Sequence, residues 1–133
     1  PSIVLKDSRP ILAISVVGGD IQDQTTLNLI LDFIEFNMMP DQAVTEPRFR
    51  TGHHEDSFNP HTDRTQAYEG LNYLEINSGI SNDVKNALTK RGHDIEETTS
   101  AIGDPVMIYI DHATNILKAA GDPNAGRHAA GLE

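Results

Sequence analysis

The sequence predicts a layered α+β domain whose sheet is largely antiparallel. Strand-like segments form a hairpin pattern at each end of the chain, and helix-like segments lie between them. Mixed elements of this kind favour helices that cover an antiparallel sheet. The chain has 133 residues and shows neither an internal repeat nor a linker, so we expect one domain over residues 1–133.

Two strands are expected over residues 2–17. The segment SIVLKD has a strand-forming composition, residues 8–10 form a turn, and ILAISVV is an almost continuous apolar run. Such a run is typical of a central strand that is covered on both faces. Gly18 and Gly19 follow it directly. Backbone without a side chain is needed where a chain turns sharply or where a ligand approaches the amides closely, and the pattern allows either.

A helix is expected after the glycines, up to residue 36. Nearly every position from 27 to 36 is apolar, apart from polar residues that recur at helical spacing on one narrow face. These polar residues are Thr25, Asn28, Asp32 and Glu35. A helix with so thin a polar stripe is predicted to be mostly buried between a sheet and another layer. Asn37 and Pro40 end it.

The middle of the chain is expected to hold a short helix, a loop and a strand. Residues 41–47 are compatible with a second helix. Residues 50–72 have no hydrophobic period and are rich in polar and turn-forming residues, which predicts a long exposed loop. Residues 71–76 then indicate a strand.

The next helix has clear start and stop signals. Ser81 is a candidate N-cap, with Asp83 in the first turn. Arg91 lies in the last turn, and Gly92 follows as the C′ residue. We expect the apolar face to consist of Val84, Ala87 and Leu88. The segment PVMIYIDHATNILKAAGD predicts a closing hairpin whose turn lies near residues 112–115.

The composition argues against several classes of function. There are 20 acidic residues against 10 Lys and Arg, and the net charge of −10 argues against nucleic-acid or anionic-membrane partners, which require clustered positive charge. Cysteine is absent, so we expect no disulfide, thiol catalysis or zinc–thiolate site. The sequence contains no stretch of about 18 apolar residues, so we expect no membrane span. It does not begin with a basic segment followed by an apolar one, so we expect no signal peptide in this chain. The compartment stays open.

Four blocks occur in an order that resembles a known family. They are PSIVLKDSRPILAISVVGGD, FNMMPDQAVTEPRFR, ALTKRGHDI and AAGDPNAGRHAAG. Together they resemble the carboxyl-terminal part of the small subunit of γ-glutamyltransferases (γ-glutamyl transpeptidases). The resemblance covers nearly the whole chain, and the loop at residues 51–72 is its least diagnostic part.

The resemblance implies a fold and an activity. Members of this family are N-terminal-nucleophile hydrolases with a four-layer αββα sandwich, so this chain would be part of such a sandwich. Their precursor cleaves itself and exposes a threonine, whose α-amine is the base when its hydroxyl attacks a γ-glutamyl amide. The acyl group then passes to water or to an amino acid. No cofactor is implied. The implied partners are the large subunit, the rest of the small subunit and a small γ-glutamyl substrate, and we expect an oligomer.

The family pattern also assigns a role to Gly18 and Gly19. In this family a glycine pair closes a central strand and presents two backbone amides to the developing oxyanion. Losing one such donor costs roughly 10²–10³ in rate, and a helix that begins directly after Asp20 would aim its positive end at the same site. The family's threonine and its carboxylate-binding serine pair fall before Pro1, so this chain is not expected to be active alone.

The sequence departs from the family beside the glycine pair. The usual Pro-Gly-Gly-Ser-Arg is replaced by Val-Gly-Gly-Asp-Ile at residues 17–21. An acidic Asp20 next to the pocket indicates a divergent branch, whose donors vary. Asp20 and Gln22 either contact the substrate or cap the following helix, for which Asp is well suited.

A cluster of candidate metal ligands lies in the predicted loop: His53, His54, Glu55, Asp56 and His61. Imidazole and carboxylate groups bind divalent ions, but the spacing matches no helix-based motif. We therefore predict a solvated loop and no metal site. Alternatively, His53 and His54 line the rim of the substrate cleft, because functional residues often lie on loops.

Three further positions have structural interpretations. Arg48, in the block EPRF, is expected to be buried and paired with a carboxylate rather than to bind substrate. Asp122 and Arg127 are expected to pair and to order the tail. Pro1 is not expected to act as a tautomerase-type base, because a hairpin follows it instead of a strand and a helix.

Three hypotheses of function follow. In the first, the chain is the carboxyl-terminal piece of a γ-glutamyltransferase-like acyltransferase or amidohydrolase. In the second, a binding or scaffold module has kept the fold and lost the chemistry. A Thr-Thr-x-x-Ser/Thr block upstream of Pro1 would favour the first over the second. The third is a metal-binding module built on the histidine loop.

Overall fold

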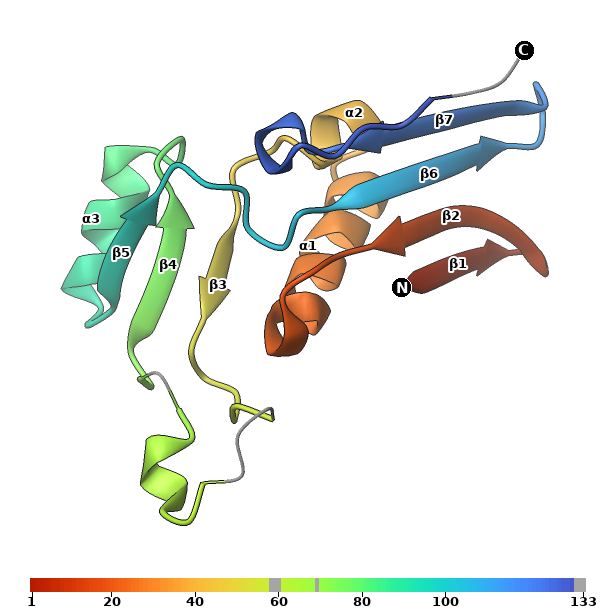
Figure 1. Ribbon diagram of the computed structural model, residues 1–133. Helices are drawn as coiled ribbons and strands as arrows, with labels where there is room; N and C mark the ends of the chain where they lie inside the picture. Colours follow the sequence, from red (N-terminus) through yellow and green to blue (C-terminus); the bar gives the residue numbers. More distant parts are fainter. Residues whose placement is uncertain (58–60, 69, 131–133) are drawn as a thin grey trace.

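Two sheets and three α-helices make up the described part of the chain (Figure 1). The computed structural model describes residues 1–57, 61–68 and 70–130, so positions 58–60 and 69 of the predicted loop lie outside the described residues. One sheet is antiparallel with the strand order β1-β2-β6-β7, and the other has the order β3-β4-β5. The predicted α+β architecture is confirmed.

The four-stranded sheet is built from two hairpins, one from each end of the chain. Asp7 and Ser8 form the first turn, and both have positive φ. The inner strands of the two hairpins pair in the middle of the sheet, where Ile14 lies opposite Met107. The strands are β1 (Ser2–Lys6), β2 (Arg9–Ser15), β6 (Val106–Asp111) and β7 (Ile116–Gly121).

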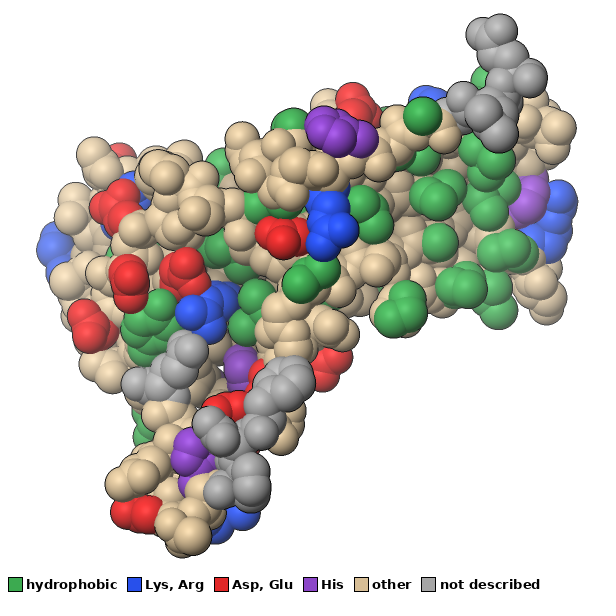
Figure 2. All heavy atoms as spheres, viewed as in Figure 1, with side chains coloured by type: hydrophobic (Ala, Val, Ile, Leu, Met, Phe, Trp, Pro, Cys, Tyr) green, Lys and Arg blue, Asp and Glu red, His purple; other side chains and the backbone are tan. Residues whose placement is uncertain are grey.

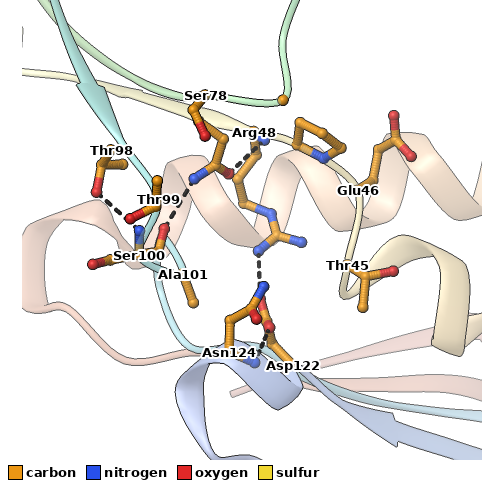
Figure 3. Close-up of a pocket in the computed structure, with 13 residues that line it drawn as sticks. Thr45, Glu46, Arg48, Ser78, Thr98, Thr99, Ser100, Ala101, Asp122 and Asn124 are labelled. Carbon is orange, nitrogen blue, oxygen red and sulfur yellow. Dashed lines mark hydrogen bonds and ion pairs between the residues drawn. The ribbon is translucent and has the colours of Figure 1, made fainter.

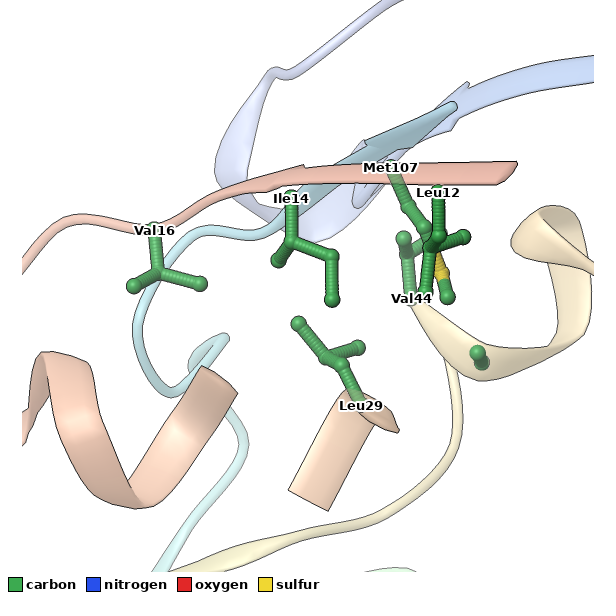
Figure 4. Packing of buried hydrophobic residues seen from close by; sticks show 7 residues of the cluster. Leu12, Ile14, Val16, Leu29, Val44 and Met107 are labelled. Atoms are coloured by element: carbon green, nitrogen blue, oxygen red, sulfur yellow. The ribbon is translucent and has the colours of Figure 1, made fainter. Parts of the chain in front are cut away.

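Helices α1 (Gln22–Ile34) and α2 (Pro40–Ala43) cover one face of this sheet. Alternate residues of β2 point toward α1, and Leu29 of α1 packs against them (Figure 4). Full burial of one such side chain stabilises the fold by about 1.5–3 kcal/mol. The buried cluster consists of Leu12, Ile14, Val16, Leu29, Ala43, Val44 and Met107.

The burial of α1 differs from the prediction. Thr25, expected on the polar stripe, is fully buried. Its small side chain packs against Gly103, where a Cβ would lie 2.6 Å from Thr25 Oγ1. Leu27, Leu31 and Ile34, expected to be covered, are 55%, 41% and 50% exposed. The predicted second layer over this helix is not formed by the described residues.

The second sheet combines an antiparallel and a parallel pair. β3 (Phe49–Thr51) pairs antiparallel with β4 (Tyr73–Asn77), which pairs parallel with β5 (Asp94–Thr98). Helix α3 (Asn82–Lys90) connects β4 to β5 and packs on β5, as a parallel pair requires a crossover. β3 lies at the start of the segment predicted to be a loop, because a strand of three residues is too short to show an alternating pattern.

The ends of α3 lie where the sequence predicts them, but its buried face differs from the predicted one. Ser81 Oγ accepts a hydrogen bond from the Val84 amide at 3.4 Å, and Gly92 has a φ of 96°. Val84, expected to be buried, is 47% exposed, whereas Lys85 is 8% exposed. The Lys85 ammonium is paired with Glu97 at 2.7 Å, which makes this burial possible. Within the residues described, no helix combines the length and apolar character that a membrane crossing requires.

Candidate active site

The turn between β2 and α1 requires glycine. Gly18 and Gly19 have positive φ values of 119° and 57°. A Cβ on Gly18 would lie 2.5 Å from Ile21 Cγ1, so a larger residue would displace the turn. The Val17 amide donates to the Gly103 carbonyl at 2.7 Å and anchors the chain where it enters this turn. The need for a sharp turn therefore accounts for the first glycine.

The carbonyls of the glycine pair are hydrogen-bonded, but their amides are not. The Gly18 carbonyl accepts from the Ile21 amide at 3.2 Å, and the Gly19 carbonyl accepts from the Gln22 amide. Neither the Gly18 nor the Gly19 N–H donates to any acceptor in the described part of the chain. Backbone donors are usually satisfied by protein, water or ligand. Two neighbouring unpaired donors can therefore serve an incoming acceptor.

A pocket of about 240 Å³ lies against Gly18. The pocket lies between the turn after β2 and the segment that follows β3. Its volume is large enough for ordered waters or a small ligand group. The polar and glycine residues in its walls are Gly18, Asp20, Arg50, Gly52, His54 and Asp56. Sequence reasoning missed Arg50 and Gly52, because their only signal was their position just after the EPRF block.

Asp20 holds a loop and does not cap the helix. Its carboxylate accepts hydrogen bonds from the Ser57 amide at 2.6 Å and from the Ser57 hydroxyl. These two bonds, the side-chain bond first, lower the pKa of Asp20, and His54 adds a smaller effect in the same direction. The predicted helix cap is wrong, because Asp20 lies inside a 3₁₀ turn and Ile21 occupies the N-cap of α1. The partner Ser57 had no sequence signal.

His54 is an unsatisfied group in this pocket. Both of its ring nitrogens are buried, and neither has a hydrogen-bond partner among the described residues. A neutral imidazole has one donor and one acceptor nitrogen, so both functions are unused. The neighbouring His53 is exposed and lines a separate hollow with Arg64 and Tyr68. Of the two histidines predicted for the cleft rim, only His54 lines the pocket beside Gly18.

The other members of the histidine loop have side-chain partners. Asp56 lies 3.4 Å from the ring of His61, and Glu55 pairs with Arg64 at 2.6 Å. In the described ranges, no three histidine or carboxylate side chains converge as a metal site would require.

Arg50 has a fixed orientation on the wall of the pocket. Its guanidinium pairs with Glu75 and lies 5.6 Å from the centre of the Tyr73 ring. The Tyr73 hydroxyl donates to Glu96 at 3.1 Å, and burial together with this bond raises the pKa of Tyr73. These contacts make Arg50 part of the three-stranded sheet as well as of the pocket.

A second polar pocket, of about 190 Å³, surrounds Arg48 (Figure 3). Arg48 is 4% exposed, and its guanidinium donates to the carbonyls of Ala43 at 2.9 Å and Val44 at 2.7 Å. It also pairs with Asp122 at 3.5 Å, which confirms the predicted buried pair. Asp122 therefore pairs with Arg48 rather than with Arg127, which contributes only its backbone amide, at 3.0 Å from the Asp122 carbonyl. These contacts give Arg48 and Asp122 a structural role.

The sequence and the fold were compared with those of known protein families. The sequence model of the gamma-glutamyltranspeptidase family matches residues 1–132. The chain belongs to the γ-glutamyltranspeptidase family. Within this family, the glutathione hydrolase proenzyme of Bacillus subtilis strain 168 is 28% identical over 132 residues, which cover 99% of this chain and 20% of that protein. The glutathione hydrolase-like YwrD proenzyme of the same strain is 26% identical, over 99% of this chain and 23% of its own length. The chain thus spans about a fifth of these relatives.

Solved γ-glutamyltranspeptidase structures share the fold. An acivicin-inhibited γ-glutamyltranspeptidase superposes with a TM-score of 0.72 at 28% identity, over 93% of this chain and 58% of that chain. A mutant of the Helicobacter pylori enzyme gives 0.71 at 28% identity, over 93% and 59%. The Pseudomonas nitroreducens enzyme complexed with L-DON gives 0.74 at 19% identity, over 100% and 61%, and indicates the fold alone. The expected N-terminal-nucleophile hydrolase fold is confirmed.

Proposed function

We propose that this chain is the carboxyl-terminal part of the catalytic subunit of a γ-glutamyl acyltransferase or amidohydrolase. The amides of Gly18 and Gly19 form its oxyanion hole. The observation that supports this most is the pair of neighbouring N–H groups that lack an acceptor in the described residues, the first of them on a residue that lines a pocket. Family membership supplies the reaction class, and the names of the relatives, glutathione hydrolases, point to γ-glutamyl donors.

In the proposed reaction, a threonine from a segment outside this chain attacks the carbonyl carbon of the γ-glutamyl amide. The carbonyl oxygen becomes negatively charged, and the N–H groups of Gly18 and Gly19 donate to it. The threonine's own α-amine takes the hydroxyl proton as the C–O bond forms and gives it to the leaving nitrogen as the C–N bond breaks. Collapse of the adduct thus expels the amine and leaves an acyl ester on the threonine, and water or a second amine then attacks this ester. The same amides stabilise both tetrahedral adducts, since their position is set before the reaction starts.

Asp20 is a proposed binding residue at this site. Its carboxylate is ionised at neutral pH, and the hydrogen bonds from Ser57, which lower its pKa, hold it in place. Ser57 occupies part of its hydrogen-bonding capacity, but a carboxylate has about four lone-pair positions. An ammonium group in the pocket would therefore meet a fixed negative charge.

The proposed partners are the large subunit and the rest of the small subunit of the same precursor. The side of the four-stranded sheet opposite α1, here called the outer sheet face, carries apolar residues, and Figure 2 shows hydrophobic side chains gathered over this sheet. Its most exposed members are Ile3, Ile108 and Leu117. An apolar sheet face of this kind marks an interface. Alone, the chain should self-associate, and a monodisperse monomer in ultracentrifugation would count against the assignment.

The test of the oxyanion hole uses the complete protein. Gly19→Val places a branched side chain beside both amides, so turnover of a chromogenic γ-glutamyl anilide should fall by at least about 10². Gly126→Val is the matched control: its φ is 65° against 57° for Gly19, and a Cβ there has open space. Both variants carry similar backbone strain.

Unchanged turnover in Gly19→Val, or an equal loss in Gly126→Val, would reject the oxyanion role. Absence of turnover in the complete wild-type protein, together with the absence of an upstream threonine, would instead favour an inactive binding or scaffold module.

A further inference from the structure

We propose that His54 binds the α-amino-acid head group of a reactant in the pocket beside Gly18. The inference rests on the proposed acyl-transfer function and adds a ligand contact to the same site. The ligand class is a small molecule with a free α-amine and a carboxylate or carbonyl oxygen, either the γ-glutamyl donor or an amino-acid or dipeptide acceptor.

The first argument is the unused hydrogen-bonding capacity of His54. Both ring nitrogens are shielded from solvent and have no partner among the described residues. A buried polar group without a hydrogen-bond partner destabilises a fold, and sites that contain such groups are often functional. Among the described residues, no hydrogen bond holds the ring in its present orientation. Rotation about Cβ–Cγ, toward a ligand in the pocket, therefore breaks no existing bond.

The second argument is the charge arrangement around the ring. Asp20 lines the same pocket and is close enough to His54 for the two to interact electrostatically. Arg50 and Asp56 also line it, but they are already engaged with Glu75 and His61. An α-amino-acid head group matches the remaining capacity: its ammonium faces the Asp20 carboxylate, and its oxygen accepts from the imidazole.

The third argument is the position of the pocket relative to the proposed chemistry. Gly18 is part of its lining, so a ligand bound there is adjacent to the proposed oxyanion donors. A residue that holds the head group next to the reacting carbonyl makes a bimolecular step effectively unimolecular, which lowers its entropic cost.

The experiment compares His54→Phe with the control His53→Phe in the complete, mature protein. A chromogenic γ-glutamyl anilide is the donor and glycylglycine the acceptor. For His54→Phe, the KM of one of them should rise roughly tenfold to a hundredfold with a smaller change in kcat. Which KM rises tells whether the head group belongs to the donor or to the acceptor. His53 is exposed and lines another hollow, so His53→Phe should leave both KM values unchanged.

Thermal unfolding separates this role from a structural one. Phenylalanine replaces an unsatisfied polar ring with an apolar ring of similar shape, so the Tm of His54→Phe should stay equal or rise. A lower Tm with both KM values unchanged would overturn the proposal.

A binding measurement keeps the inference separate from the proposed function. The nitrogen-15 signals of the His54 ring should shift when L-glutamate or glycylglycine is added to the wild-type protein, even if no turnover is found. No shift with either compound would overturn the head-group site, whereas a shift without turnover would overturn only the catalytic proposal.

Discussion

Gly18 and Gly19 lie where the chain leaves β2 and enters α1. The structure gives a steric reason for glycine at the first of them, because a Cβ would overlap Ile21. The same backbone conformation leaves both amides without an acceptor in the described residues, and Gly18 lines a pocket. Tight turning and access for a ligand are therefore compatible at one position, and the backbone that makes the turn is also the backbone proposed to stabilise the oxyanion.

Ser57→Ala tests the hydrogen bonds that hold Asp20. Because the Ser57 side chain is the largest cause of the lowered pKa, its removal should raise the pKa of Asp20 toward the ordinary value of 3.8. The folded-state pKa lies below the unfolded one, so this attachment of the loop stabilises the fold above about pH 3.9 and is lost as the pH falls through the folded pKa. Titration of the Asp20 carboxyl carbon by NMR measures the shift.

Asp63 provides a matched control for this titration. Its pKa is also lowered, chiefly by the side chain of Thr65, whose hydroxyl donates to it at 2.7 Å. Thr65→Ala should therefore raise the pKa of Asp63 and leave that of Asp20 in place. An Asp20 pKa that is the same in the wild type and in Ser57→Ala would contradict the account.

At the scale of elements, Arg48 joins α2 to β7. It donates to two carbonyls at the end of α2 and pairs with Asp122, which directly follows β7. Arg48→Met leaves a buried carboxylate without its charge partner and should lower the free energy of unfolding by roughly 3–5 kcal/mol. Urea denaturation measures this loss.

Lys85→Met is the comparison for Arg48→Met. Lys85 is also buried, but its partner Glu97 is 53% exposed and can be solvated when the pair is broken. Its loss should be smaller, near the range of about 0–1 kcal/mol seen for exposed pairs. Equal losses in the two variants would show that burial of the partner carboxylate does not decide the effect.

Local signals predicted most elements, and contacts between elements explain the misses. The hairpins and the ends of α3 were predictable because alternation, turns and caps are encoded by neighbouring residues. The burial of Thr25 was not, because it depends on Gly103, far along the chain. Lys85 is buried through Glu97 on another element. At the site, Gly18 and Gly19 stood out in the sequence, whereas Ser57 and Arg50 reach the pocket only through the tertiary fold.

At the scale of the whole molecule, we propose that this chain contributes one sheet and its covering helices to a larger sandwich. It spans about a fifth of its curated relatives, and in the described part of the chain helices cover only one face of its four-stranded sheet. The αββα expectation requires a second sheet against the outer sheet face, which exposes Ile108 and Leu117 at 42% and 68%. In the complete protein these side chains should be buried, since exposed apolar side chains gathered on one sheet face mark an interface.

The most direct test of the central claim is a structure of the complete, mature protein with a boronic acid analogue of the γ-glutamyl group bound as a tetrahedral adduct. The account predicts one boronate oxygen within about 2.7–3.1 Å of both the Gly18 and the Gly19 nitrogen. A boronate oxygen bound by other donors, with these two amides hydrogen-bonded to protein acceptors, would contradict it.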